Sequence, residues 1–350
     1  METSDFTAPS YKELRPLKSP KTKTFPVYDE LVNKLVAAKT HPDDEIAHVM
    51  GTCAGYAYSD LQTVAMIMAR LGLEENKCRM IAEYVDIMFI TSTSFLIQSK
   101  DGRVVILCYR GTPLTDLISW LTDINVEPAK IKIPSPSGSG EYDVHGGYYR
   151  NVRATRYEII WALERAIDGR SVLRDGAEMP NALEALYITG HSLGAASASM
   201  LAIMLLTEPS YDPMVSRLKA VYTFGQPMIT SPELAKRCND NDFLRQKVIR
   251  YVNANDIAPQ LPPTQAGHFE HFGTEYQYKP EGERGSWHLN KKPRKQLSSP
   301  LALVANPLSF LARQLPLTRN IPFPASVYDH LPQYYIAALT PGGVRSEFGD

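Results

Sequence analysis

Cysteine is scarce in this sequence of 350 residues, which contains four. They are widely spaced, so they lack the short spacing that a thiolate metal site needs. Nothing in their arrangement requires a disulfide bond, which makes a reducing compartment compatible with the sequence. We therefore expect no metal site. The four residues are Cys53, Cys78, Cys108 and Cys238.

Long apolar segments are missing as well. No uninterrupted run of about 18 apolar residues occurs, so we predict no transmembrane helix. The N-terminal stretch METSDFTAPSYKELRPLKSPKTKTFP has no apolar core of a signal peptide. The default expectation is a protein of the cytoplasm or of a lipid surface, and nothing else in the sequence indicates a location.

An excess of charge of either sign is also absent. The sequence has 37 Lys and Arg against 38 Asp and Glu, a net charge of −1. A general nucleic-acid binder carries a clear basic excess, so we expect no nucleic-acid partner. The hydrophobic content of 44% and the charged content of 21% are ordinary for a globular protein.

What the sequence does contain is a polar His-Ser pair between glycines, in the stretch YITGHSLGAASASM from Tyr187 to Met200. A buried strand is predicted before the pair and a helix after it, which places Ser192 at a strand-to-helix turn. Gly190 and Gly194 fit such a turn, because side chains two positions either side of the serine would clash. The helix N-terminus would then face any anion formed at the serine. The alternative is a tight turn with a serine that caps the helix.

Strands and helices alternate along the rest of the chain. Residues 28–73 and 144–167 have helical spacing, and two strands within 87–109 flank a hairpin turn at 100–102. Residues 134–140 read as a Ser/Gly/Pro loop, and three further strands are expected in LKAVYTFGQP, QKVIRYVNANDIAP and TEYQY. This alternation predicts an α/β fold with a mostly parallel central sheet flanked by helices. We expect a loose leader over residues 1–25 and a single domain over 26–350.

A serine hydroxyl is a poor nucleophile until a base takes its proton, and a carboxylate usually orients that base. In this type of fold the chain order is Ser, then Asp or Glu, then His. Asp256 directly follows the predicted strand segment VIRYVNAN, and His330 lies in a loop that opens the last helix well downstream. We predict a Ser192–Asp256–His330 triad. An Asp that caps its own turn is the alternative for Asp256.

The other histidines have simpler explanations. His268 and His271 are close in sequence to Asp256 and are expected to be structural imidazoles. His288 lies in a charged loop and is expected to be solvated, whereas His191, beside the serine, is expected to pack the turn.

A serine hydrolase also needs donors for the oxyanion. One is the backbone N–H of the residue after the nucleophile, Leu193. The other must come from the loop after an earlier strand, where Gly111 permits close approach and Thr112 could donate through both its N–H and its hydroxyl. The alternative for this Arg-Gly-Thr sequence is a simple turn that ends the strand.

Together these segments resemble the class 3 lipases, the family of the fungal triacylglycerol lipases. The resemblance covers about residue 87 to the C-terminus and is carried by an ordered set of motifs: YRGT with WLTD, VHGGYY, YITGHSLGAA, TFGQP with YVNANDIAPQLPP, and DHLPQYY. It implies an α/β-hydrolase fold, here with a helical N-terminal extension, and ester hydrolysis without a cofactor. It also implies the triad above, Thr112 and Leu193 at the oxyanion, and a structural role for Asp123.

The resemblance further implies a helical lid, whose candidate here is residues 112–127. Its apolar residues recur at helical spacing and form one face, with Trp120 at the margin. Such a lid would cover the site in water and open on lipid. A helix packed on the core is the alternative. The candidate lid residues are Leu114, Leu117, Ile118, Trp120 and Leu121.

An insertion over about 280–325 departs from the fungal pattern. It contains the basic cluster KKPRK, followed by an apolar stripe at helical spacing that Pro307 would kink. A basic cluster beside an apolar stripe suits an anionic membrane, so residues 291–316 could provide peripheral membrane contact, as could the lid. The alternative is a core-packing insertion with a solvated loop.

The leading hypothesis is therefore a serine carboxylester hydrolase that acts on acyl lipids at an oil or membrane interface, most simply a triacylglycerol lipase. A phospholipase A1 and a short-chain carboxylesterase are alternatives of the same chemistry. A lipase-like scaffold without turnover is the alternative from another class, although such proteins usually lose a triad member and all three candidates are present here.

Overall fold

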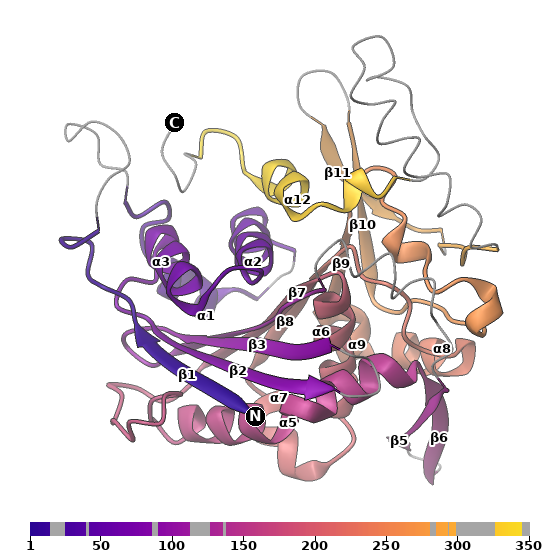
Figure 1. Cartoon of the computed structure of the whole chain (residues 1–350), viewed down its shortest axis with the longest axis horizontal. Coiled ribbons are helices and arrows are strands. Elements are labelled where there is room, and N and C mark those ends of the chain that lie inside the picture. The colour runs from indigo at the N-terminus through magenta and orange to yellow at the C-terminus, as the bar shows by residue number, and fades with distance from the viewer. Residues whose placement is uncertain are drawn as a thin grey trace.

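A computed structural model gives the fold of residues 1–14, 25–39, 42–85, 90–112, 127–135, 138–280, 285–292, 294–298 and 326–344. Its centre is a twisted sheet with helices on both faces (Figure 1). The lid candidates Leu114, Leu117, Ile118, Trp120 and Leu121, together with Asp123, lie outside these described residues, as does most of the 280–325 insertion.

In the described part of the chain, nine strands form the sheet in the order β1-β2-β3-β4-β7-β8-β9-β10-β11. The central strands from β4 to β10 run parallel, whereas the pairs at both edges are antiparallel. The expected α/β architecture is thus confirmed, with a parallel centre and antiparallel edges. The strands are β1 (Glu2–Thr7), β2 (Lys77–Val85), β3 (Ile90–Gln98), β4 (Val104–Tyr109), β7 (Ala185–His191), β8 (Leu218–Phe224), β9 (Val248–Val252), β10 (Thr274–Lys279) and β11 (Ser286–Asn290).

Helices cover the two faces as separate layers (Figure 1). One layer contains α1 (Leu31–Ala37), α2 (Asp44–Tyr56), α3 (Leu61–Leu71) and α12 (Pro332–Leu339). The other contains α5 (Gly146–Ile167), α6 (Leu193–Met204), α7 (Asp212–Val215), α8 (Pro232–Asp240) and α9 (Asp242–Lys247). Short 3₁₀ turns lie at η2 (Pro209–Tyr211), η3 (Ala258–Gln260), η4 (Thr264–Ala266) and η5 (Tyr328–His330).

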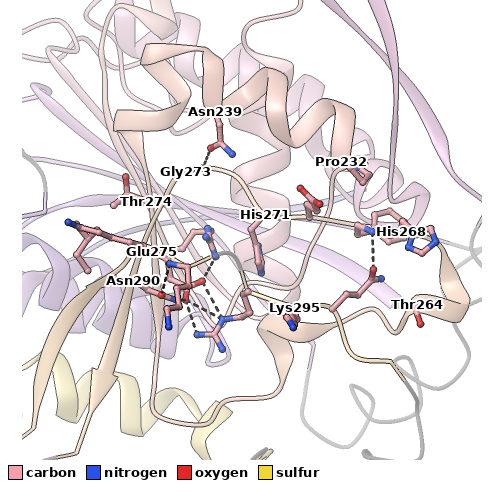
Figure 2. A pocket seen from close by; sticks show the side chains of 18 residues that line it. Pro232, Asn239, Thr264, His268, His271, Gly273, Thr274, Glu275, Asn290 and Lys295 are labelled. Atoms are coloured by element: carbon pink, nitrogen blue, oxygen red, sulfur yellow. Dashed lines mark hydrogen bonds and ion pairs between the residues drawn. The ribbon is translucent and has the colours of Figure 1, made fainter.

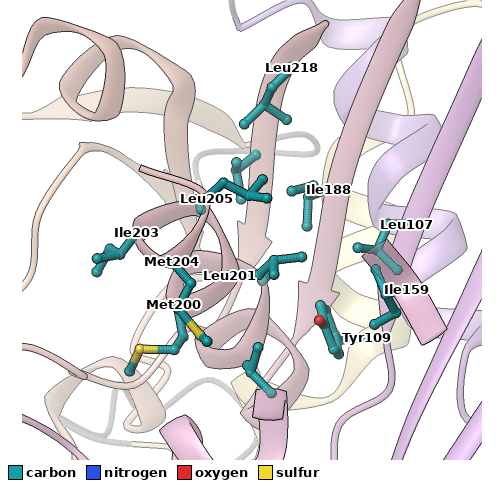
Figure 3. Packing of buried hydrophobic residues seen from close by; sticks show 14 of the residues in the cluster. Leu107, Tyr109, Ile159, Ile188, Met200, Leu201, Ile203, Met204, Leu205 and Leu218 are labelled. Atoms are coloured by element: carbon teal, nitrogen blue, oxygen red, sulfur yellow. The ribbon is translucent and has the colours of Figure 1, made fainter. Parts of the chain in front are cut away.

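The strand sequences explain why both faces are covered. Strand β4, VVILCY, is apolar throughout and buried throughout, as expected for a central parallel strand. Because side chains alternate across a strand, Ile106 packs with the α2 layer, whereas Leu107 packs with the α6 layer. Figure 3 shows the hydrophobic core between the sheet and the α6 layer, in which Leu201 of α6 lies near Ile188 of β7. Because α6 packs on this face of the sheet, the chain must turn toward this face when it leaves β7.

Two glycines of α2 allow α12 to approach this helix closely. A β-carbon added to Gly51 would lie 2.4 Å from Leu339, and one added to Gly55 would lie 2.7 Å from Ile336. The bare backbone of α2 therefore lets α12 pack against it more closely than side chains would allow.

The structure corrects several details of the sequence analysis. The expected loose leader, residues 1–25, contains β1, which pairs with β2 from Glu2 opposite Ala82 to Thr7 opposite Lys77. Strands β2 and β11 were not expected, and the expected loop at 134–140 belongs to a hairpin of β5 (Ala129–Ser135) and β6 (Gly138–Val144). The hairpin that joins β3 and β4 around residues 100–102 is confirmed.

Among the helices that the structure describes, no single one has both the length and the apolar character to cross a membrane; only α6 taken together with the bent Pro209–Val215 segment reaches that threshold.

Candidate active site

Ser192 lies at the turn between β7 and α6 with a strained backbone, φ 59° and ψ −127°. Two close approaches explain the flanking glycines. A β-carbon at Gly190 would lie 2.4 Å from the Gly194 backbone, and one at Gly194 would lie 2.2 Å from the carbonyl oxygen of Tyr109. Both positions therefore exclude side chains, and the turn can form only with this spacing of glycines.

The three residues of the predicted triad lie within hydrogen-bond distance of one another. His330 Nε2 is 2.8 Å from Ser192 Oγ, and His330 Nδ1 is 2.8 Å from Asp256 Oδ2. All three side chains are at most 2% exposed. Because the carboxylate can only accept, Nδ1 carries the proton and Nε2 presents its lone pair to the serine hydroxyl. The arrangement is competent to take a proton from Ser192.

Asp256 is held as a carboxylate by three donors. Besides His330, the hydroxyl of Tyr335 donates to Oδ2 at 2.5 Å and the N–H of Ala258 donates to Oδ1 at 2.8 Å. Burial raises the pKa of Asp256, but the charge of His330 and these hydrogen bonds outweigh burial and leave the pKa below its ordinary value. A charged carboxylate can stabilise the imidazolium that forms on His330.

The loop that carries His330 is fixed to the loop that carries Asp256. The Asn253 side chain donates to the carbonyl of Asp329 at 3.0 Å, and the N–H of Asn255 donates to the Asp329 carboxylate at 3.1 Å. The N–H of Ser326 donates to the carbonyl of Asn255 at 2.8 Å. These contacts hold η5 against the end of β9, so the base and its carboxylate are positioned as one unit.

His191 packs under the base, in keeping with the expected packing role. Its Nε2 donates to the carbonyl of His330 at 2.7 Å, and its Nδ1 lies 2.8 Å from the hydroxyl of Tyr58. The rings of His191 and His330 lie 4.5 Å apart. Burial, and next the charge of His330, lower the pKa of His191 to about 3, so it stays neutral and serves as a support rather than a second base.

The predicted oxyanion residues lie on two segments that meet at the strand-to-helix turn around Ser192. Leu193 is the first residue of α6, so its N–H belongs to the turn that has no intrahelical acceptor. A β-carbon on Gly111 would lie 2.6 Å from the carbonyl of His191, so the loop after β4 touches the strand-to-helix turn directly. Thr112, the next residue, is buried there. The loop that carries Thr112 therefore contacts the turn at His191, and the oxyanion roles of Thr112 and Leu193 stay predictions.

The remaining histidines lie elsewhere. His271 Nε2 donates to the carbonyl of Pro259 at 2.8 Å, which is a structural contact as expected. His268 is exposed, and His288 is exposed on β11, where it contacts Ser286. Within the described ranges no group of His, Cys, Asp or Glu side chains could hold a metal ion.

Sequence reasoning did not single out Tyr58, Gly225 or Tyr335. Tyr335 lies within the quoted motif DHLPQYY, but its contact with Asp256 joins residues 79 positions apart. Gly225 has φ +59°, and a β-carbon there would lie 2.7 Å from Asp256 Oδ2. The motif TFGQP contained this glycine, and only the fold shows what the missing side chain makes room for.

The chain is similar in sequence to known lipases. Residues 106–266 match the model of the lipase (class 3) family. A triacylglycerol lipase of Ricinus communis is 26% identical over 256 residues, which cover 62% of this chain and 46% of that protein. A lipase of Rhizomucor miehei is 28% identical over 188 residues, 53% of this chain and 45% of that protein. Phospholipase A1-II 1 of Oryza sativa is 27% identical over 173 residues, 46% of this chain and 40% of that protein. The chain spans less than half the length of each of these relatives.

Solved fungal structures have the same fold. Lipase II from Rhizopus niveus matches with a TM-score of 0.55 at 18% identity, covering 82% of this chain and 92% of that one. The triacylglyceride lipase of Rhizomucor miehei matches with a TM-score of 0.52 at 20% identity, covering 89% of this chain and 98% of that one. Residues 106–266 therefore match the class 3 lipase family, and the chain has a structure like that of the fungal triacylglycerol lipases.

Proposed function

We propose that this protein is a serine carboxylester hydrolase that cleaves acyl esters of lipids, with triacylglycerol as its substrate, through an acyl-enzyme on Ser192. One observation carries the proposal: the buried chain of hydrogen bonds from Ser192 through His330 to Asp256, with both distances at 2.8 Å. A nucleophile, a base and a carboxylate in this order are the requirements of acyl transfer by serine.

The chemistry follows from the donors and acceptors. Ser192 Oγ attacks the ester carbonyl while His330 Nε2 takes its proton, and the charged Asp256 stabilises the resulting imidazolium. The N–H of Leu193, with Thr112, stabilises the oxyanion. His330 then returns the proton to the departing alcohol. Water, activated by the same base, attacks the acyl-enzyme and releases the fatty acid.

The relatives support lipid esters as the substrate class. Two curated relatives are named triacylglycerol lipases or lipases, and another is named phospholipase A1. The phospholipase match and the exposed lysines at 291, 292 and 295 favour a phospholipid substrate as the second candidate. The lid at 112–127 and membrane contact through 291–316 belong to this proposal as predictions.

The test is hydrolysis of p-nitrophenyl esters of increasing acyl length, of emulsified triacylglycerol and of phosphatidylcholine, by the wild type and by Ser192→Ala. We expect activity that rises above the solubility limit of the long esters and that is lost in the variant. Activity confined to short soluble esters would indicate a carboxylesterase and contradict the lid. A wild type that is inactive on every ester and unlabelled by an organophosphorus ester would support the scaffold alternative.

A further inference from the structure

A pocket lies away from the triad, at the β9–β10–β11 edge of the sheet. Its volume is about 940 Å³, and it is lined by the loop from Thr264 to Gly273, by Thr274 and Glu275 of β10, and by residues 289–292 and 294–296. None of the three triad residues lines it. Figure 2 shows Glu275, His271 and Lys295 among the side chains that surround it. The proposed ester hydrolysis gives this pocket no role.

The deep wall of the pocket contains two arginines fixed on one carboxylate. Arg250 Nη1 donates to Glu275 Oε2 at 2.7 Å, and Arg294 Nη2 donates to Oε1 at 2.8 Å. Arg250 also donates to the carbonyl of Phe272 at 2.9 Å. Both guanidinium groups are largely buried, so their positions are set before any ligand binds. Glu275 can neutralise only one of them, which leaves one positive charge in the wall.

Three lysines on the rim add to this charge. Lys291, Lys292 and Lys295 are exposed and line the same pocket. Against these five cationic side chains stand two lining carboxylates, Glu270 and Glu275, which leaves a surplus of three positive charges.

The positive charge in the pocket wall also affects the pKa of His271. Burial lowers the pKa of His271 well below its ordinary value, and the charge of Arg250 lowers it further, against the opposing effect of Glu275. The arginine charge is thus not cancelled at this position by the carboxylate beside it. An anion is the ligand that such a field attracts.

We propose that this pocket binds the phosphate group of a phosphate ester. A phosphate carries between one and two negative charges near neutral pH and offers several acceptor oxygens, so it satisfies more of these donors than a carboxylate does. Arginine and lysine are the side chains that proteins use for phosphate. The volume exceeds that of a phosphate alone and leaves room for an attached glycerol or sugar. Leu289, which is 49% exposed on the rim, offers an apolar contact to such a group.

Two sources share this chemistry, a soluble phosphate ester and the headgroup of an anionic phospholipid. Both are tested with Ser192→Ala, so that hydrolysis cannot alter the probe and the result is independent of the proposed esterase activity. Binding of sn-glycerol 3-phosphate is measured by titration calorimetry, with glycerol as the uncharged control. Sedimentation with phosphatidylcholine vesicles, with and without phosphatidic acid, tests the lipid source.

The test variant is Lys291→Gln/Lys292→Gln/Lys295→Gln, and the matched control is Lys100→Gln/Lys130→Gln/Lys132→Gln, which removes the same charge from exposed lysines elsewhere. We expect saturable binding of glycerol 3-phosphate that weakens about tenfold in the test variant, because three exposed cationic contacts are lost, and that stays unchanged in the control. Both variants should keep the thermal midpoint of the parent, because these lysines are exposed.

Vesicle binding that requires phosphatidic acid, weakens in the test variant and is competed by glycerol 3-phosphate would assign the pocket to a lipid headgroup. Binding of glycerol 3-phosphate without such vesicle binding would assign it to a soluble ester. Absence of saturable binding to either probe, or equal losses in the two triple variants, would overturn the proposal.

Discussion

Replacing Asp256 by Asn is the sharpest test of how His330 is made a base. The carboxylate accepts from His330 and Tyr335 at Oδ2 and from the N–H of Ala258 at Oδ1. Asparagine has one oxygen and one NH₂ group for the same three partners. If the NH₂ group took the Oδ1 position, it would face a backbone N–H that cannot turn away. If it took the Oδ2 position, the hydroxyl of Tyr335 could rotate and accept from it.

The second arrangement costs less and reverses the tautomer of His330. The amide then donates to Nδ1, so the ring proton moves to Nε2, which can no longer take the proton of Ser192. We expect kcat on p-nitrophenyl butyrate to fall by about 10⁴, the loss that the wrong tautomer causes in a serine triad. This corresponds to about 5.5 kcal/mol of transition-state stabilisation.

Asp329→Asn provides a matched control. Asp329 is also buried, it precedes His330, and its carboxylate accepts from the N–H of Asn255, a bond that an amide oxygen can keep. We expect its kcat to stay within a few-fold of wild type. A folded Asp256→Asn variant that keeps a tenth of the wild-type kcat, or whose Nδ1 still carries the proton by ¹⁵N NMR, would refute the tautomer argument.

Two further predictions concern the surroundings of the triad, and a third concerns His48 of α2. Gly225→Ala would place a methyl group 2.7 Å from Asp256 Oδ2 and 2.8 Å from His330 Nδ1, so we expect kcat to fall by about 10²-fold, and wild-type kinetics would contradict the packing. Tyr335→Phe leaves Asp256 without one donor and the N–H of Asn253 without its acceptor. The free energy of unfolding should therefore drop by about 1–3 kcal/mol in urea denaturation, and an unchanged midpoint would count against this role. Burial lowers the pKa of His48 from its ordinary value of 6.5 to about 4. Between pH 6.5 and pH 4, His48 is therefore protonated in the unfolded state but not in the folded state. Stability should therefore fall by about 3 kcal/mol as pH drops from 6.5 to 4, His48→Gln should lose this part of the dependence, and equal pH slopes for the two proteins would disprove it.

The strand-to-helix turn at Ser192 could be predicted because the sequence features that mark it are local. The strand before Ser192 and the helix after it have different apolar periods, and the two glycines stand where the turn requires them. Asp256 and His330 followed from the chain order of the fold and from their places after a strand and before a helix. Geometry now places these three side chains in one hydrogen-bonded chain, and their catalytic roles stay predictions.

Other parts of the fold could not be predicted because their causes are tertiary. Strand β1, ETSDFT, has a single large apolar residue, and only pairing with β2 makes it a strand. Tyr58 contacts His191 across 133 positions, so no local pattern marks it. The pocket beside β10 is likewise assembled from residues between 232 and 296, and Arg250 meets Glu275 only when β9 and β10 lie side by side.

The triad is divided between the two helical layers. Ser192 immediately precedes α6 on one face of the sheet, whereas His330 leads into α12, which rests on the glycines of α2 on the other face. The contact between the nucleophile and the base therefore depends on docking of the α2–α12 layer as well as on the contacts of η5 with the end of β9. A disturbance that loosens this layer would separate them and leave the sheet and the α6 core folded. Enzyme activity should thus report on docking of the layers, and mild denaturant should abolish it before the circular dichroism of the fold changes.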